Sequence, residues 1–164
     1  MYRNIRIFLL LLPSVLVGGD TNRDRATLAG VKAINVVVDP LDPQLAKTDL
    51  TDAMLRSRIE ERLRKAAIPL DTNAVEFLGL HITSTQVSRS RLQMGQSPYS
   101  LCFALGFYQP VALVRDQKIR TAIPTWNVNA ILVVPLKPLA ESSLSTADQL
   151  ADIFVNAWRV VNPQ

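Results

Sequence analysis

Cysteine and histidine are nearly absent from this sequence of 164 residues, which contains only Cys102 and His81. A single cysteine excludes an internal disulfide, so the fold depends on its core alone even in an oxidising compartment. One histidine and one distant cysteine do not provide the residues of a catalytic triad or of a histidine-rich metal site. We therefore predict no catalytic residues, no metal site and no cofactor.

Other sequence signs of enzymes are also missing. The six glycines are scattered, so no glycine-rich loop is present to hold a phosphate. The adjacent carboxylates Glu60 and Glu61 are each matched to a basic residue four positions later. Asp39 and Asp42 precede prolines, where aspartate is a common turn residue. An active site built on paired carboxylates is therefore not expected.

The N-terminal residues 1–19 resemble a secretory signal peptide, because two arginines precede the short apolar run "IFLLLLPSVLV". That run is shorter than the roughly 20 apolar residues that a membrane-spanning helix needs. Cleavage is expected before Asp20, and an uncleaved N-terminal anchor is the alternative. The chain carries a formal charge of +4, part of which lies in this segment. The charge therefore does not argue for nucleic acid as a partner, and we expect a bacterial periplasmic or secreted protein.

The remaining chain predicts a short linker over residues 20–29 and a single domain over residues 30–164. Strands are expected over residues 31–38, 75–87, 99–114 and 120–134, because each run is rich in β-branched or aromatic residues. Helices are expected from the N-cap residue Thr51 to a stop at Pro69, and over residues 146–161 after the N-cap Ser145. A long loop is expected over residues 88–98.

This β-α-β-β-β-α order predicts an α+β fold, a two-layer sandwich with a four-stranded mixed sheet and two helices on one face. The first two strands should be parallel, and the last three should form an antiparallel meander. Each helix has one apolar stripe, so both helices can cover the same side of the sheet.

The residue pattern of the third expected strand predicts which side of the sheet is left uncovered. Large side chains alternate with small ones along residues 101–108, and successive side chains of a strand point to opposite faces. If the large row is core, the opposite row faces outward as a flat surface with few charges. The candidate interaction face then contains Gly79, His81, Thr83, Cys102, Ala104, Gly106, Tyr108, Thr125 and Asn127. An ordinary solvent-facing sheet is the alternative interpretation.

The first long helix offers a second candidate surface. Its outer side is basic, and the residues that represent this candidate face are Arg58, Arg62 and Lys65. An ordinary solvated helix face is the alternative to a docking site for an acidic partner.

Three segments of the chain, "INVVVDPLDP", "IEERLRKAAIPL" and "TWNV", resemble a family of exported bacterial α+β domains of uncharacterised role. The topology is also similar to the small N-terminal domain of the periplasmic TolB proteins. In TolB proteins a propeller follows that domain, and this chain has none. The resemblance implies a non-enzymatic, protein-binding role in the cell envelope.

Three hypotheses about function follow. The first is an exported, non-catalytic interaction module of the periplasm or cell envelope that binds another envelope protein or a second copy of itself. The second is a small-ligand-binding protein or an enzyme whose site lies at the strand-end loops. The third is an envelope scaffold tethered by an uncleaved N-terminal segment, which would be its only contact with a membrane.

Overall fold

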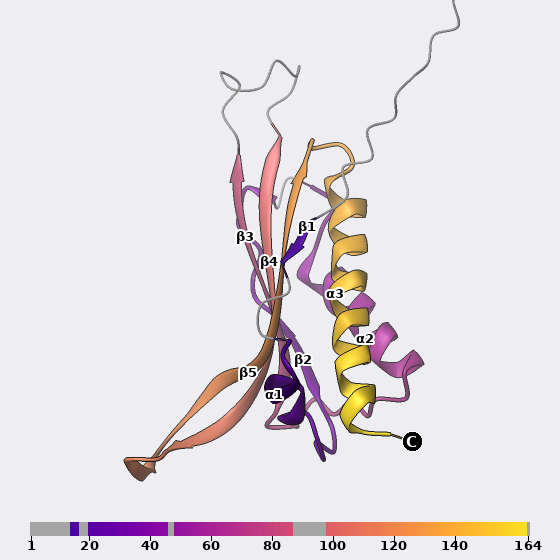
Figure 1. Ribbon diagram of the computed structural model, residues 1–164. Helices are drawn as coiled ribbons and strands as arrows, with labels where there is room; N and C mark the ends of the chain where they lie inside the picture. The colour runs from indigo at the N-terminus through magenta and orange to yellow at the C-terminus, as the bar shows by residue number, and fades with distance from the viewer. Residues whose placement is uncertain (1–13, 17–19, 46–47, 87–97, 164) are drawn as a thin grey trace, which may run out of the picture.

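The computed structural model describes residues 14–16, 20–45, 48–86 and 98–163 (Figure 1). Its elements are β1 (Ser14–Leu16), α1 (Asn22–Ala26), β2 (Asn35–Val38), α2 (Asp52–Lys65), β3 (Phe77–Gln86), β4 (Tyr99–Leu113), β5 (Asp116–Val134) and α3 (Leu139–Val161). Apart from residues 14–16, the expected leader lies outside the described residues, as does the expected loop except for Pro98. Among the residues that the structure describes, no helix has the length and apolarity needed to cross a bilayer.

The sheet has the strand order β1-β5-β4-β3-β2. Strands β2 and β3 are parallel, and the pairs β3–β4 and β4–β5 are antiparallel. The predicted four-stranded mixed sheet is therefore confirmed, and β1 adds a short fifth strand at the free edge of β5. Both long helices lie on one side of this sheet, which makes two layers (Figure 1).

The alternation along β4 separates core from surface. Leu101, Phe103, Leu105 and Phe107 are completely buried on the side that the helices cover. Cys102, between two of them, is exposed. The predicted assignment of the two sheet faces is thus confirmed for β4, and each buried side chain of this size contributes roughly 2–3 kcal/mol to folding.

Helix α2 begins after the predicted N-cap Thr51 and ends at Lys65, earlier than the predicted stop at Pro69. The Thr51 side chain accepts a hydrogen bond from the Met54 backbone N–H at 3.1 Å, which satisfies one of the free donors of the first turn. Leu55, Ile59 and Leu63 form its buried stripe. The helix stops before Ala67, whose positive φ of 59° turns the chain out of the helix.

Helix α3 begins earlier than predicted, at Leu139 rather than after Ser145. The expectation of an N-cap at Ser145 was wrong because the apolar stripe continues backward to the completely buried Leu139. Packing against the sheet therefore overrides the local cap signal. The Thr146 hydroxyl donates to the Ser142 carbonyl at 2.9 Å, as helix-interior threonines commonly do.

Residues 20–29, expected as a linker, are instead packed against the domain. They contain the short helix α1, and Leu28 is completely buried. Asp20 accepts hydrogen bonds from Arg25 at 2.7 and 2.6 Å, and one from the indole N–H of Trp126 at 2.8 Å. This polar stretch can pack against the domain because Asp20 is paired with Arg25 and with the buried Trp126.

We expect Leu105→Asp to destabilise the domain by more than about 4 kcal/mol, because it buries an unpaired carboxylate. Ala104→Lys, one residue away on the opposite side of the sheet, should cost at most about 1 kcal/mol. Urea denaturation followed by circular dichroism measures both changes. Equal losses would contradict the assignment of the two faces.

The hydrogen bonds of the Asp20 carboxylate should make the stability of the fold depend on pH. The hydrogen bonds from Arg25, and to a smaller extent that from Trp126, lower the pKa of the Asp20 carboxyl below its ordinary value. A carboxyl whose pKa is lower in the folded state stabilises the fold above its unfolded pKa, and this contribution disappears as the pH falls through the folded pKa. We expect Asp20→Asn to cost about 1 kcal/mol at neutral pH. The difference from the wild type should shrink below about pH 4 in denaturation curves, and a difference independent of pH would contradict this.

Candidate functional site

The uncovered side of the sheet is formed by three strands in register. Cross-strand pairs such as Gly79 with Gly106 and Cys102 with Ile131 place outward side chains in rows across β3, β4 and β5. We call this surface the open face; it comprises Phe77, Gly79, His81, Thr83, Thr85, Ser100, Cys102, Ala104, Gly106, Tyr108, Asn127, Asn129, Ile131 and Val133.

Charged side chains are absent from these fourteen positions, none of which is lysine, arginine, aspartate or glutamate. Solvent-facing sheets usually carry such residues, which keep them from associating. The titratable His81 makes a hydrogen bond through Nδ1 with Asp39 at 2.9 Å. Both side chains are about 55% exposed, so this pair lies at the border of the open face in contact with water.

Aromatic rings cover the glycines at one end of the open face. The rings of Phe77 and Tyr108 stack with centroids 4.8 Å apart and planes 3° from parallel. A Cβ added to Gly79 would lie 3.0 Å from the Tyr108 ring, and one added to Gly106 would lie 3.1 Å from it. Two glycines opposite each other therefore let the tyrosine ring lie flat on the sheet, which makes this end of the face smooth.

Aliphatic side chains are exposed at the other end of the same face. Ile131 and Val133 on β5 are 41% and 42% exposed. Cys102, the residue opposite Ile131, is exposed as well. A surface without formal charges thus extends over much of the sheet, with apolar side chains at both of its ends.

Of the nine predicted face residues, Thr125 is the exception. A register shift between Phe107 and Tyr108 forms a bulge in which Thr125 has no partner on β4. Its hydroxyl lies 3.0 Å from that of Thr27 and 2.8 Å from the side-chain oxygen of Gln109. At this bulge the Thr125 side chain therefore contacts the segment after α1 and does not belong to the rows of the open face. Simple alternation along β5 cannot reveal this, because it assumes a continuous register.

The basic residues of α2 are occupied within the molecule. Arg58 pairs with Asp148 of α3, and Arg62 lies 3.2 Å from the same carboxylate. The hydrogen bond to Asp148 raises the pKa of Arg62. Lys65 lies 2.6 Å from Glu61 of its own helix. These contacts of Asp148 depend on α3 lying beside α2, which the sequence alone does not indicate.

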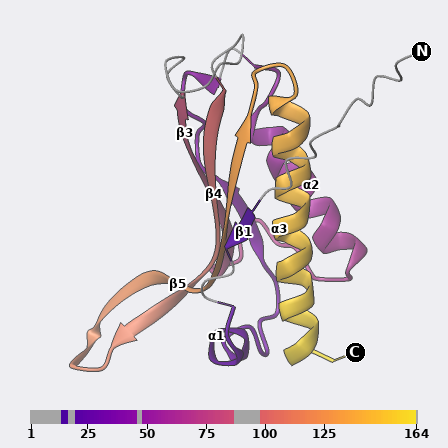
Figure 2. The same ribbon diagram turned by 45° about the horizontal axis from the view of Figure 1, so that its top comes forward.

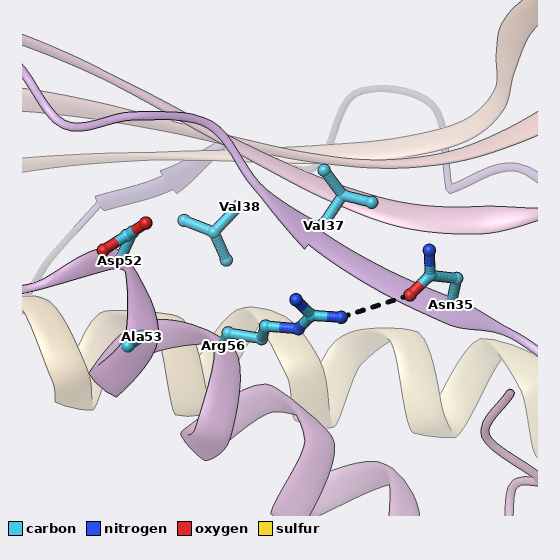
Figure 3. A pocket seen from close by; sticks show the side chains of 6 residues that line it. All are labelled: Asn35, Val37, Val38, Asp52, Ala53 and Arg56. Carbon is cyan, nitrogen blue, oxygen red and sulfur yellow. Dashed lines mark hydrogen bonds between the residues drawn. The ribbon is translucent and has the colours of Figure 1, made fainter. Parts of the chain in front are cut away.

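Two shallow hollows flank the edge strand β2. One, of about 230 Å³, is lined by Val37, Asp39, Phe77, Gly79, Leu80, His81 and Tyr108. The other, of about 240 Å³, lies between β2 and the start of α2, where Arg56 reaches toward Asn35 (Figure 3). Ligand pockets usually measure about 300–1,000 Å³ and have converging polar groups. Within the described ranges no group of three or more histidine, cysteine, aspartate or glutamate side chains is placed to hold a metal ion.

Comparison with known proteins gives no match to a family model and no match to a curated protein. Similar solved structures include the PelC dodecamer from Paraburkholderia phytofirmans, with 11% identity, a TM-score of 0.47 and coverage of 90% of this chain and 98% of that one. A PDZ domain protein from Parabacteroides distasonis has 13% identity, a TM-score of 0.43 and coverage of 74% and 32%. A minor lipoprotein from Acinetobacter baumannii has 12% identity, a TM-score of 0.33 and coverage of 80% and 94%.

None of these three structures is named as a TolB protein, so the resemblance to the TolB N-terminal domain stays a prediction. Their identities and TM-scores are too low for an argument about function, which therefore has to come from the surfaces described above.

The stacked pair Phe77–Tyr108 should stabilise the open face measurably. We expect a double-mutant cycle of Phe77→Ala and Tyr108→Ala to give a coupling energy of about 1 kcal/mol. Thermal denaturation of the four proteins measures it. A cycle of Phe77→Ala with the distant Thr85→Ala serves as the control and should give nearly zero. A coupling that is no larger for Tyr108 than for Thr85 would contradict the stacking.

Proposed function

We propose that this chain is a non-catalytic interaction module of the bacterial cell envelope that binds another envelope protein through the open face. The observation that carries the proposal is the combination of a sheet face left bare by both helices with fourteen positions that lack any formal charge. The proposed location rests on the signal-like residues 1–19.

A neutral face of this kind favours association because no charged side chain has to be desolvated when a partner covers it. Burying an unpaired charge in an interface costs several kcal/mol, whereas burying threonine, alanine and valine side chains does not. The cores of interfaces are depleted in charged residues and enriched in aromatic ones, as at Tyr108. The matching partner surface is therefore a neutral sheet or helix face rather than a strongly charged one.

The second hypothesis, a ligand-binding protein or an enzyme, has less support. The hollow beside Tyr108 is smaller than usual ligand pockets, and its polar groups are those of the exposed pair Asp39 and His81. A pair in open contact with water is a weak basis for acid–base chemistry, which depends on shielding from solvent.

The third hypothesis, a tethered scaffold, differs from the first in the fate of residues 1–19 and not in the use of the open face. Intact-mass spectrometry of the exported protein separates the two. A mass that starts at Asp20 supports a free module, and a mass that starts at Met1 supports the tether.

Cys102 provides a direct probe of the open face because it is exposed and is the only cysteine of the chain. We expect partner binding in an envelope extract to slow the reaction of Cys102 with a maleimide by about tenfold or more, since a covered thiol is inaccessible. Ala104→Lys should weaken partner capture after crosslinking by about tenfold or more, because it places an unpaired charge in the interface.

Ala29→Lys is the matched control, since Ala29 is exposed and lies outside the open face. It should capture the partner as the wild type does. Equal capture by Ala104→Lys and Ala29→Lys, or unchanged labelling of Cys102, would contradict the proposal. Sedimentation of the purified protein alone tests whether the occupant is instead a second copy.

A further inference from the structure

Strands β4 and β5 continue beyond the rest of the sheet as a two-stranded arm. Strand β3 begins at Phe77, opposite Tyr108, so residues 109–123 pair only with one another. We call these residues the arm. Figures 1 and 2 show that it bends away from the body on the side opposite to the two long helices. A two-stranded ribbon on its own is only marginally stable in water, so the arm gains from a covering surface.

The arm carries exposed aliphatic side chains on a basic background. Val114 in the turn is fully exposed, and Ile119 and Ile123 are 46% and 42% exposed. Among the charged residues of the arm, Arg115, Lys118 and Arg120 outnumber Asp116. Two such arms would repel each other, so the surface that covers an arm should be acidic and should offer some apolar area.

The same chain carries acidic residues at the sheet edge that β2 forms. Asp39 follows the last residue of β2 and Asp52 is the first residue of α2, and we call these two residues the acidic rim. Arg56, which lines the same hollow as Asp52, is paired with Glu60. Asp39 and Asp52 line the two hollows on either side of Val37, and Val38 lies beside Asp52 (Figure 3). Among the residues that the structure describes, β3 is the one strand that pairs with β2, so the outer edge of β2 also offers unpaired backbone groups.

One molecule cannot bring these two surfaces together. Strand β3 separates the arm's parent strands β4 and β5 from β2, and the arm points away from the body. We propose that the arm of one copy docks on the acidic rim of a second copy. Because the two surfaces differ, this contact is heterologous, and its repetition gives a ring or an open chain of copies. The proposal goes beyond the interaction module proposed above, and its acidic rim borders the open face where Asp39 is hydrogen-bonded to His81.

Charge reversal tests this contact with the complete exported protein. The arm variant is Arg115→Glu, Lys118→Glu and Arg120→Glu, and the rim variant is Asp39→Lys and Asp52→Lys. We expect the dissociation constant for self-association, measured by sedimentation velocity at low salt, to rise by about tenfold or more in each variant. A mixture of the two variants should associate again, because each reversed surface then meets its complement.

The control is a triple reversal at exposed positions outside both surfaces, Arg23→Glu, Lys32→Glu and Arg159→Glu, which should associate as the wild type does. If the rim variant fails to fold by circular dichroism, Asp39→Asn and Asp52→Asn replace it and should still weaken association. A wild type that stays monomeric at millimolar concentration, or a mixture that does not associate, would overturn the proposal. Binding of the wild type but not of the arm variant to vesicles of anionic phospholipid, without any effect on self-association, would assign the arm to a membrane surface instead.

Discussion

The alternation of side chains along β4 is the constraint on which the rest of this structure depends. Because successive residues point to opposite sides of a strand, one row of large side chains commits that side of the sheet to the core. Leu101, Phe103, Leu105 and Phe107 are all completely buried, so both long helices have to lie on their side. In the part of the chain that the structure describes, the opposite side is left without cover and consists of small or uncharged residues.

The contact between α2 and α3 explains why the helical layer is a less suitable docking surface than the sheet. Asp148 is 8% exposed at its side chain and is paired with Arg58 and Arg62. Removing one partner of a pair around a buried carboxylate leaves an uncompensated charge, so these arginines are committed to holding the helices together. Their own side chains are 45% and 37% exposed, which limits the net stabilisation because water screens the attraction.

The molecule therefore has two kinds of exposed surface whose composition is not needed for the folding of a single copy. The open face is neutral and flat, and a neutral partner surface suits it. The arm is basic and the rim beside β2 is acidic, and the proposed contact between copies rests on this difference in charge. An assembly of this kind would display several open faces at once, which increases avidity for a partner without any new contact.

The amino-acid sequence by itself determined the presence of the two long helices, the four main strands and the two layers, because hydrophobic period and turn residues act locally. The β-α-β-β-β-α order, the parallel first pair of strands and eight of the nine residues predicted on the open face follow from these local patterns. Only the tertiary structure decided the start of α3 at Leu139, the role of Asp148 and the bulge at Thr125. It also decided that residues 20–29 pack on the domain, since Asp20 reaches Trp126 across 106 positions of sequence. These features depend on contacts between segments far apart in the chain, and no local pattern of residues encodes which distant side chain a charge or a hydroxyl will meet.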